Sequence, residues 1–438
     1  MFSLPRNRIV PERPAEMNKR AKKDRAIWMF AGGPMQEPAA RKILERGYKL
    51  IVTDRDDNCI CAKYAAEIVH LDTFDVPGNL AAGTRLGKEW RIEAVLCPAA
   101  DCHETVAEVG RQLGLHAISP VISRKCRYKQ VTRQVLTRAG IPQPRFKAVK
   151  GVQEARHFLR EIGGEGVLKA TDNSGSRGFG VVRKGETINA EMYERAREAG
   201  TTGLVIVEEL LRPVETEIAE QSVETLWHNG TMYWLNWVDR LFRKDFLRFT
   251  GLKTGMYDDL SWGVEIGHIN PAIHAHSTKI ELFELIHRAG VAIGMKREKG
   301  GHILKADIML TEKGPCIIEL TPRLSGGWDS SASTPARGAD FAGGLIALAL
   351  REELDLALWH RYFEYRNPSL FASVMAQIDE GARDCIGRRF AIGADFERER
   401  SIENALKNLR EGRYVVSVEQ RGEPADAQGE RRIGRARL

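Results

Sequence analysis

Long hydrophobic runs are missing from this sequence of 438 residues. The longest, residues 341–350, includes two glycines, whereas a helix that spans a bilayer needs about 18 apolar residues. The first residues (MFSLPRNRIVPERP) lack the apolar segment of a secretory signal peptide. These absences argue against a membrane protein, and the expected location is the cytoplasm.

Cysteine pairs with the spacing of a structural zinc site are also missing. The seven cysteines are odd in number and include no Cys-x-x-Cys pair, so a disulfide framework is not expected. Cys97, Cys102 and His103 are close enough in sequence to suggest a metal site, but they lack a second pair of ligands. Buried, reduced thiols are the favoured interpretation.

Net positive charge is missing outside the two ends of the chain. Of the formal charge of +7, the first 25 residues carry +5 and residues 425–438 carry +2, so residues 26–424 are neutral. A groove for nucleic acid needs its positive charge on the folded body. Nucleic acid is therefore not an expected partner, and the basic ends are interpreted as solvated tails.

Strands and helices alternate at the start of the chain, which implies a parallel sheet. Strands are expected at 27–31, 48–53 and 94–97, and helices at 35–46 and 104–113. The turn at Gly32–Gly33, with Asp54 further on, suggests a dinucleotide site, but Gln36 and Glu37 occupy the region of the third glycine. A structural turn is the favoured interpretation.

The rest of the chain predicts a mixture of helices and strands. Helices are expected at 124–139, 278–289 and 401–409, and strands at 145–150, 166–170, 370–377 and 414–419. At about 100 to 200 residues a domain, the length predicts two to four domains. The fold class is α/β and α+β, with several domains.

The first segment with a chemical signature is a glycine-rich loop between two strands. Lys169 ends one strand, residues 172–180 contain three glycines and two serines, and a second strand resumes at Val181. Such a loop lets backbone N–H groups approach a chain of phosphates. A mobile hairpin loop is an equally good interpretation of this segment taken alone.

The second segment is a hairpin with two carboxylates. Asp307 and Glu319 lie symmetrically about Lys313, so we expect them to face each other across the strand pair, by way of a turn at 312–314. Unpaired carboxylates so close would repel, and a divalent cation with oxygen ligands removes the repulsion. A surface hairpin with a coincidental acid pair is the alternative.

The third segment follows directly, as Thr321-Pro322-Arg323-Leu324-Ser325-Gly326-Gly327. Arg323 lies four residues after a metal carboxylate, and its guanidinium suits phosphate and carboxylate oxygens. A structural salt bridge is the alternative role for this arginine.

In this order the three segments resemble the ATP-grasp superfamily over about residues 26–350. The loop at 175–178, the run 319–327 and a Val-Glu-Glu-Leu segment at 207–210 are its specific features. The run 264–271 (VEIGHINP) resembles the carboxylate–amine ligase branch, which contains L-amino-acid ligases. The resemblance implies an ATP-grasp fold that follows an N-terminal parallel-sheet domain.

The resemblance also implies roles for individual residues. The residues expected to contact phosphate are Lys129, Lys169 and the loop residues Ser174, Gly175, Ser176 and Gly178. The residues expected to contact adenine are Glu208, Glu209 and Leu210. The ribose is assigned to Glu220, with Glu215 as the alternative. The metal ligands are Asp307, Glu319 and Thr321, and the catalytic residues are Arg323 and Lys169. The expected cofactors are ATP and Mg²⁺, or Mn²⁺ in its place.

Two positions depart from the pattern. Thr321 stands where the family usually has asparagine, and a hydroxyl can still ligate Mg²⁺. The stretch 212–219 replaces a glycine that usually precedes the ribose glutamate, which leaves the ribose assignment open. No biotin-carrier lysine motif is present, so a biotin-dependent carboxylase is disfavoured.

The resulting hypothesis is an ATP- and Mg²⁺-dependent ligase that joins a small carboxylate, such as an amino acid, to an amine through an acyl phosphate. Candidate residues for the acceptor pocket are Ser325, Gly326, Gly327, Trp328, Asp329, Arg337 and His268. Trp328 as core packing and Asp329 as a helix cap are the alternatives. Formyl or carbamoyl phosphate chemistry in nucleotide synthesis and a non-catalytic nucleotide-binding regulator remain open.

The same hypothesis divides the chain. The expected parts are a basic arm (1–25), a pre-grasp domain (26–122), a linker helix with the lid (123–210), a catalytic subdomain (211–350) and a C-terminal subdomain with a basic tail (351–438). The expected partners are small molecules, and the resemblance adds a homodimer as one assembly. Residues 240–263 suit an active-site loop or a surface connection equally well.

Overall fold

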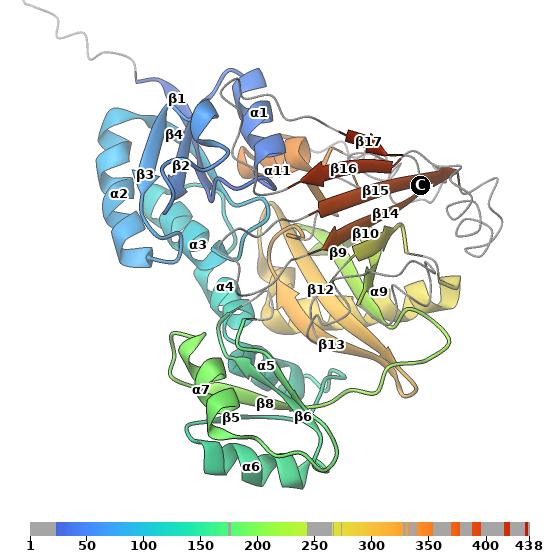
Figure 1. Ribbon diagram of the computed structural model, residues 1–438. Helices are drawn as coiled ribbons and strands as arrows, with labels where there is room; N and C mark the ends of the chain where they lie inside the picture. The colour runs from blue at the N-terminus through green and yellow to red at the C-terminus, as the bar shows by residue number, and fades with distance from the viewer. Residues whose placement is uncertain are drawn as a thin grey trace, which may run out of the picture.

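A computed structural model gives the structure of most of the chain. It describes residues 23–173, 177–242, 265, 267–272, 274–326, 330–331, 334 and 340–353, and the backbone of the strands at 369–376, 388–395, 416–420 and 434–436. These residues form three sheets with helices packed against them, and Figure 1 shows the N-terminal sheet at the upper left, the large sheet in the middle and to the right, and the small sheet at the bottom.

The N-terminal sheet is parallel, as the alternation of strands and helices predicts. Its strand order is β3-β2-β1-β4, with bounds β1 (Arg25–Phe30), β2 (Lys49–Asp54), β3 (Glu67–His70) and β4 (Arg91–Leu96). Strand β1 is an almost continuous apolar run because both faces of the sheet are covered. Trp28 packs toward α2 (Val76–Glu89) and α3 (His103–Leu113), while Ile27 packs toward α1 (Glu37–Glu45).

The turn after β1 has a structural role. The Gly32 N–H donates to the Asp54 carboxylate at 2.8 Å, and a Cβ on Gly32 would lie 2.3 Å from the Cys59 sulfur. Asp54 therefore holds the turn closed. The geometry fits the structural interpretation of this turn, which the sequence favours over a dinucleotide site.

The prediction of a single helix at 124–139 is wrong, because two helices occupy this segment. They are α4 (Pro120–Arg127) and α5 (Lys129–Arg138), and Tyr128 between them has extended backbone dihedrals. The N–H of Lys129 leaves the helical pattern and donates to the carbonyl of Thr171 at 2.7 Å. The break sets Lys129 at the start of α5, beside the loop that follows β6 (Gly166–Ala170).

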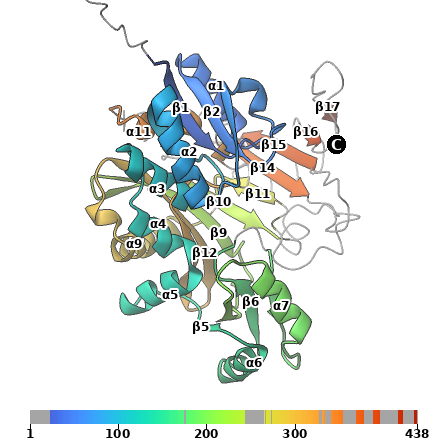
Figure 2. The ribbon, with the colours of Figure 1, turned by 90° about the vertical axis from the view of Figure 1, so that its left-hand side faces the viewer.

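A small antiparallel sheet follows, with strand order β5-β8-β6-β7. Its other strands are β5 (Phe146–Val149), β7 (Gly180–Val182) and β8 (Val205–Glu209). Helices α6 (Val152–Glu161) and α7 (Ala190–Glu198) share a hydrophobic cluster with these strands. Figure 2 shows this sheet below the rest of the molecule, joined to it through α4 and α5.

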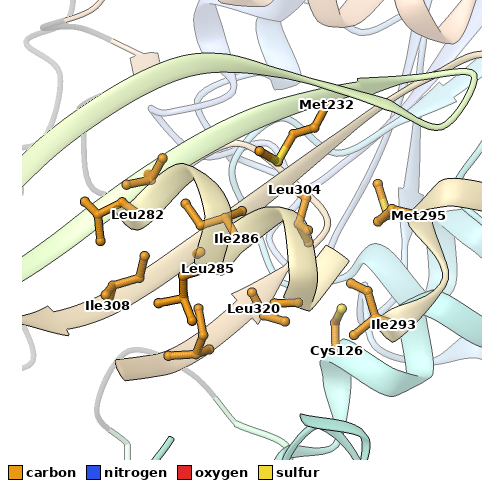
Figure 3. Close-up of a cluster of buried hydrophobic side chains, with 14 of the residues drawn as sticks. Cys126, Met232, Leu282, Leu285, Ile286, Ile293, Met295, Leu304, Ile308 and Leu320 are labelled. Atoms are coloured by element: carbon orange, nitrogen blue, oxygen red, sulfur yellow. The ribbon is translucent and has the colours of Figure 1, made fainter. Parts of the chain in front are cut away.

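The large sheet has nine strands in the order β13-β12-β9-β10-β11-β14-β15-β16-β17. The first five strands in this order have the bounds β9 (Glu220–His228), β10 (Thr231–Leu241), β11 (Gly267–Asn270), β12 (Gly301–Thr311) and β13 (Gly314–Thr321), with β13 at the edge. The helix α9 (His276–Ile293) buries Leu282, Leu285 and Ile286 against one face of this sheet, as Figure 3 shows. The opposite face is therefore the one that can carry polar side chains.

The last four strands extend the large sheet. They are β14 (Ser369–Ala376), β15 (Arg388–Asp395), β16 (Val416–Gln420) and β17 (Gly434–Ala436), and β14 pairs with β11. The strands expected near 370–377 and 414–419 are confirmed as β14 and β16. The helix expected at 401–409 lies outside the described residues.

Helix α11 (Phe341–Ala349) connects the N-terminal and large sheets. Its Ile346 packs with Ile27 and Ile43 of the N-terminal sheet and α1. Its Leu348 packs with Leu226 of the large sheet. This apolar helix is too short to span a bilayer, and no helix among the described residues is long and apolar enough to do so.

Candidate active site

A cleft lies between the small sheet and the polar face of the large sheet. Residues from both sheets and from α5 line it, and they are Lys129, Arg133, Pro144, Val167, Lys169, Ala170, Asn173, Arg177, Phe179, Glu208, Glu209, Leu210, Leu211, Pro213, Val214, Ala219, Glu220, Arg240, Phe242, Asp307, Met309, Ile318 and Glu319. Eight of the residues predicted from the sequence for ATP and metal thus share one cleft. They are Lys129, Lys169, Glu208, Glu209, Leu210, Glu220, Asp307 and Glu319.

The predicted carboxylate pair is brought together by the hairpin of β12 and β13. Asp307 pairs directly with Glu319, although the turn has two residues rather than the expected three. The pairing shifts by one residue between Asp307 and Ile308, where Ile318 forms a bulge. An even turn with one bulge produces the same facing pair as the odd turn that we expect from the sequence.

Cations surround both carboxylates. Lys305 pairs with Asp307, and the Arg240 guanidinium lies 3.4 Å from the second oxygen of Asp307. Burial opposes ionisation of Asp307, but Lys305 and Arg240 outweigh it and hold its pKa below the usual value. Burial likewise opposes ionisation of Glu319, and Lys129, at 2.9 Å, lowers the pKa of that carboxyl. Both groups are therefore negative at neutral pH.

The oxygen atoms at this hairpin fit a hard divalent cation. Thr321 lies on the same face of β13 as Glu319, because side chains alternate along a strand. No group of three or more His, Cys, Asp or Glu side chains that could hold a metal occurs among the described residues. Mg²⁺ does not need such a cage, because it is usually held by one or two carboxylates plus water and substrate phosphates.

On the opposite wall of the cleft, Glu208 holds two cations. Its carboxylate accepts from Lys169 at 2.8 Å and from Arg133 at 2.7 Å, and Glu208 is 1% exposed. Burial opposes its ionisation, but Arg133 and Lys169 lower the pKa of Glu208 to about 2. The side chain that the resemblance assigns to the adenine hinge therefore positions Lys169.

The hinge residues after Glu208 run along the cleft wall. The Glu209 N–H donates to the Arg145 carbonyl at 2.8 Å, and the Glu209 side chain pairs with Arg145 at 3.1 Å. Leu210 also lines the cleft. The backbone of this short segment is the part that could contact a flat base.

The glycine-rich loop between β6 and β7 is described at its two ends. Gly178 has φ +70°, and a Cβ there would lie 2.6 Å from that of Ala199, so only glycine fits. Arg177 and Phe179 beside it line the cleft. The predicted phosphate contacts Ser174, Gly175 and Ser176 lie outside the described residues.

The predicted ribose residue Glu220 lies in the cleft and is bound to Arg240 at 2.5 Å. Burial raises the pKa of Glu220 to about 7, with Asp307 and Glu265 adding to the effect and Arg240 opposing it. The alternative, Glu215, is exposed and is not part of the cleft wall.

Arg323 follows β13 but is not among the residues that line the cleft, and it is bound by Asp101, in the segment between β4 and α3. Its guanidinium donates to the Asp101 carboxylate, with Nε at 2.8 Å. Burial opposes its charge, but Asp101 raises the pKa of Arg323, so the charge persists at every accessible pH. The arginine predicted to meet the phosphoryl group is therefore held by a residue from the N-terminal part of the chain.

The predicted acceptor residues are described only in part. Ser325 is buried and its N–H donates to Glu224 at 2.6 Å, and Gly326 lies against the carbonyl of Ala99. His268 pairs with Arg240 on the neighbouring strand, so the two side chains share the polar face of the large sheet. Gly327, Trp328, Asp329 and Arg337 lie outside the described residues, as does most of the 240–263 segment.

Four charged residues of this region are missing from the sequence-based prediction. They are Asp101, Arg133, Arg240 and Lys305. The period of two along a strand places Lys305 on the face of Asp307, and the helical period places Arg133 one turn after Lys129, so both signals are in the sequence. Asp101 has no local signal, because it meets Arg323 across 222 residues of chain.

Known proteins resemble this chain in sequence and in fold. Residues 127–326 match the family model described as phosphoribosylglycinamide synthetase, ATP-grasp (A) domain. The structure also superimposes on the crystal structure of L-amino acid ligase from Bacillus licheniformis with a TM-score of 0.62 and 17% identity, covering 82% of this chain and 81% of the other. The chain has the ATP-grasp fold. The fold class and the superfamily resemblance inferred from the sequence are thereby confirmed.

Two relatives match this chain by sequence. Phosphoribosylamine–glycine ligase of Caldanaerobacter subterraneus subsp. tengcongensis is 27% identical over 319 residues, which are 67% of this chain and 69% of that protein. The uncharacterized protein y4rH of Sinorhizobium fredii is 26% identical over 291 residues, 66% of this chain. The second match spans 56% of the length of y4rH.

Proposed function

We propose that this ATP-grasp chain is a ligase that joins a small carboxylate to an amine, with MgATP as the energy source. The observation that carries the proposal is the facing pair Asp307 and Glu319, with Lys129 and Lys169 on the walls of the same cleft. The similarity to an L-amino acid ligase and to phosphoribosylamine–glycine ligase supports this reaction class.

The proposed roles follow from position and charge. The backbone of Glu209 and Leu210 would contact adenine, and Glu220 the ribose. Lys129 and Lys169 would neutralise phosphate oxygens. Asp307, Glu319 and Thr321 would hold Mg²⁺, which when bound neutralises and orients the triphosphate. ATP binding would require Lys129 to exchange its contact with Glu319 for one with phosphate.

In the proposed reaction, the substrate carboxylate attacks the γ-phosphorus, and ADP leaves. The amine then attacks the acyl phosphate carbon, and phosphate leaves as the amide forms. Arg323 would stabilise the charge on the transferred phosphoryl group. The cleft between the two sheets would keep water from the acyl phosphate. The protein mainly positions the reactants and supplies charge.

A second candidate is a ligase whose amine is carried on a phosphorylated sugar. The family match over 127–326 and the 27% identical phosphoribosylamine–glycine ligase favour it specifically. Both candidates use the same cleft and the same first step. They differ in the amine, and therefore in the size and charge of the acceptor pocket.

The test is ADP and phosphate release from MgATP with pairs of carboxylates and amines, including amino acids and aminosugar phosphates. We expect release that requires both partners and is abolished in Glu319→Gln. The matched control is Glu312→Gln, because Glu312 is an exposed carboxylate at the tip of the same hairpin. ADP and phosphate release that needs only a carboxylate and bicarbonate or formate would contradict amide formation. ATP binding without ADP release, for every pair of substrates, would favour a nucleotide-binding regulator.

A further inference from the structure

The thiols of Cys97 and Cys102 lie against each other near Arg323. Cys97 follows β4 and Cys102 precedes α3, and their sulfur atoms are 3.2 Å apart. Among the six described cysteines this is the pair whose sulfurs lie within hydrogen-bonding distance. A disulfide has its sulfurs about 2.0 Å apart, so a shift of about 1.2 Å separates the present geometry from a bonded one.

The two thiols are not equivalent. Burial and the nearby Asp101 carboxylate oppose ionisation of Cys97, but the Cys102 thiol, the Ala100 N–H at 3.3 Å and Arg323 outweigh them and lower the pKa of Cys97. The hydrogen bond to Cys97 and burial raise the pKa of Cys102. Cys97 is therefore the nucleophile of the pair, because a thiolate reacts and a thiol does not. Cys97 retains 8% exposure, whereas Cys102 is fully buried.

The segment between the two cysteines touches the candidate active site at two points. Asp101 accepts the hydrogen bond from Arg323. The Ala99 carbonyl lies 3.0 Å from where a Cβ on Gly326 would be, so the segment packs on the backbone after Arg323. A change in the backbone of residues 97–102 would therefore displace the partner that holds Arg323.

We propose that Cys97 and Cys102 form an oxidation site whose disulfide disturbs the Asp101–Arg323 contact and so weakens the use of MgATP. The oxidant class is a peroxide. The Cys97 thiolate attacks one peroxide oxygen, the O–O bond breaks, and the sulfur becomes a sulfenic acid as the first water forms. Cys102 then attacks that sulfur, the S–O bond breaks, and the departing hydroxide takes a proton to form the second water. A dithiol reductant reduces the disulfide back to two thiols by exchange and is itself oxidised to a disulfide.

Two simpler interpretations fit the geometry less well. A zinc site needs further ligands, and the described residues contain no such group here. An ordinary pair of core thiols does not require a cation and an N–H beside one sulfur. Arg323 and Ala100 supply both.

The covalent step is tested by treating the full-length protein with hydrogen peroxide and digesting it with trypsin. One tryptic peptide, residues 92–111, contains both cysteines and no others. We expect this peptide to lose two hydrogen atoms and to recover them with dithiothreitol. Cys102→Ser should leave Cys97 as a sulfenic or higher acid instead. An unchanged peptide after peroxide treatment that oxidises an exposed thiol would overturn the proposal.

The link to Arg323 is tested separately. With Arg323→Met the thiolate loses its cation, so we expect Cys97 to react with peroxide about tenfold more slowly at neutral pH, whereas Arg145→Met should leave the rate unchanged. An equal rate in wild type and Arg323→Met would disprove the coupling. This result does not depend on what reaction the cleft performs.

The effect on nucleotide rests on the proposed function and is measured last. Oxidised wild type should bind MgATP about tenfold more weakly than reduced protein, and dithiothreitol should restore binding. Cys102→Ser should lack this reversible loss, while Cys316→Ser, a half-buried thiol elsewhere, should retain it. Reduced protein that does not bind MgATP would contradict the proposed function. A disulfide that forms without loss of binding would contradict only the switch.

Discussion

At the scale of single residues, charged side chains that line the cleft are already paired with one another. Glu208 holds Arg133 and Lys169, and Glu319 holds Lys129. Such pairs cost desolvation, and they are tolerated when each charge has a close partner. Their consequence is that Lys129 and Lys169 are held in the cleft before any nucleotide binds. Removing one carboxylate would leave buried cations without compensation.

We expect Glu208→Gln to lower the free energy of unfolding by about 3 to 5 kcal/mol, because it leaves the charges of Arg133 and Lys169 without their carboxylate partner. Its neighbour provides the control. Glu209→Gln should cost under about 1 kcal/mol, because the Glu209–Arg145 pair is largely exposed, with the arginine side chain 58% accessible. Urea denaturation at pH 7 measures both. Equal losses in the two variants would contradict the account of Glu208 as a buried anchor.

His302 provides a pH-dependent test. It is buried against His116, and burial, with the neighbouring His116, lowers its pKa to about 4. A base with a depressed pKa in the folded state stabilises the fold fully above its unfolded value of about 6.5, and this contribution is lost as the pH falls toward 4.

Between pH 7 and pH 4, wild type should therefore lose as much as about 3 kcal/mol more stability than His302→Gln. The exposed His157 is the control, and His157→Gln should follow the wild-type curve. The measurement is the free energy of unfolding as a function of pH. Parallel curves for wild type and His302→Gln would show that His302 is not held neutral.

At the scale of elements, the hairpin of β12 and β13 shows which structural features the alternation of side chains along a strand can predict. The facing of Asp307 and Glu319 is predictable because side chains alternate with a period of two. The bulge at Ile318 is not predictable from the same pattern, because it depends on contacts outside the hairpin. The carbonyls of Ile317 and Ile318 both accept hydrogen bonds from Arg133 of α5.

Other elements have weak local signals or none. The helix α2 contains Pro77 and three glycines, which lower helix propensity, so it is absent from the sequence-based prediction. The break at Tyr128 has neither glycine nor proline, and its reason is the contact of the Lys129 N–H with Thr171, about 40 residues away. Elements with strong periodicity, such as β6 and α9, are confirmed near their predicted bounds.

The glycine-rich loop yields an element-scale prediction. Gly178 and Gly185 both have positive φ, but a Cβ on Gly178 would meet Ala199 and α7, whereas nothing lies within 4 Å of one on Gly185. Gly185→Ala should cost about 1 kcal/mol of stability from the backbone alone. Gly178→Ala should cost about 1 to 3 kcal/mol more, because the loop must move away from α7.

The two alanine variants should also differ in nucleotide affinity. If the loop between β6 and β7 covers the phosphates, Gly178→Ala weakens ATP binding and Gly185→Ala does not. Isothermal titration with MgATP measures this difference. Equal affinities, together with the expected difference in stability, would indicate that this part of the loop does not contact nucleotide.

At the scale of the whole molecule, several contacts join the N-terminal part of the chain to the large sheet, and two of them bear on stability and on the proposed reaction. One is α11, which buries Ile346 in the N-terminal core and Leu348 against the large sheet. The other is the Asp101–Arg323 pair. Arg323 follows β13 of the carboxylate hairpin, so the second contact sets the position of an arginine that the proposed reaction uses.

Shortening a buried side chain of α11 should therefore destabilise the N-terminal sheet and the large sheet together. We expect Ile346→Ala to cost about 2 to 5 kcal/mol with one cooperative transition, because Ile346 is fully buried in the N-terminal core and Leu348 of the same helix packs on the large sheet. Ile280→Ala, at a residue 48% exposed on α9, should cost much less. Far-ultraviolet circular dichroism in urea follows both. A separate early transition in Ile346→Ala would mean that the two domains unfold independently.

The central claim is that the facing carboxylates of β12 and β13 hold a divalent cation at the phosphates of ATP. The most direct test is the affinity for ATP, by isothermal titration, with and without Mg²⁺, in wild type, Glu319→Gln and the hairpin-tip control Glu312→Gln. The account predicts that Mg²⁺ strengthens ATP binding in wild type and Glu312→Gln, and that this Mg²⁺ dependence disappears in Glu319→Gln. An undiminished effect of Mg²⁺ in Glu319→Gln would contradict it.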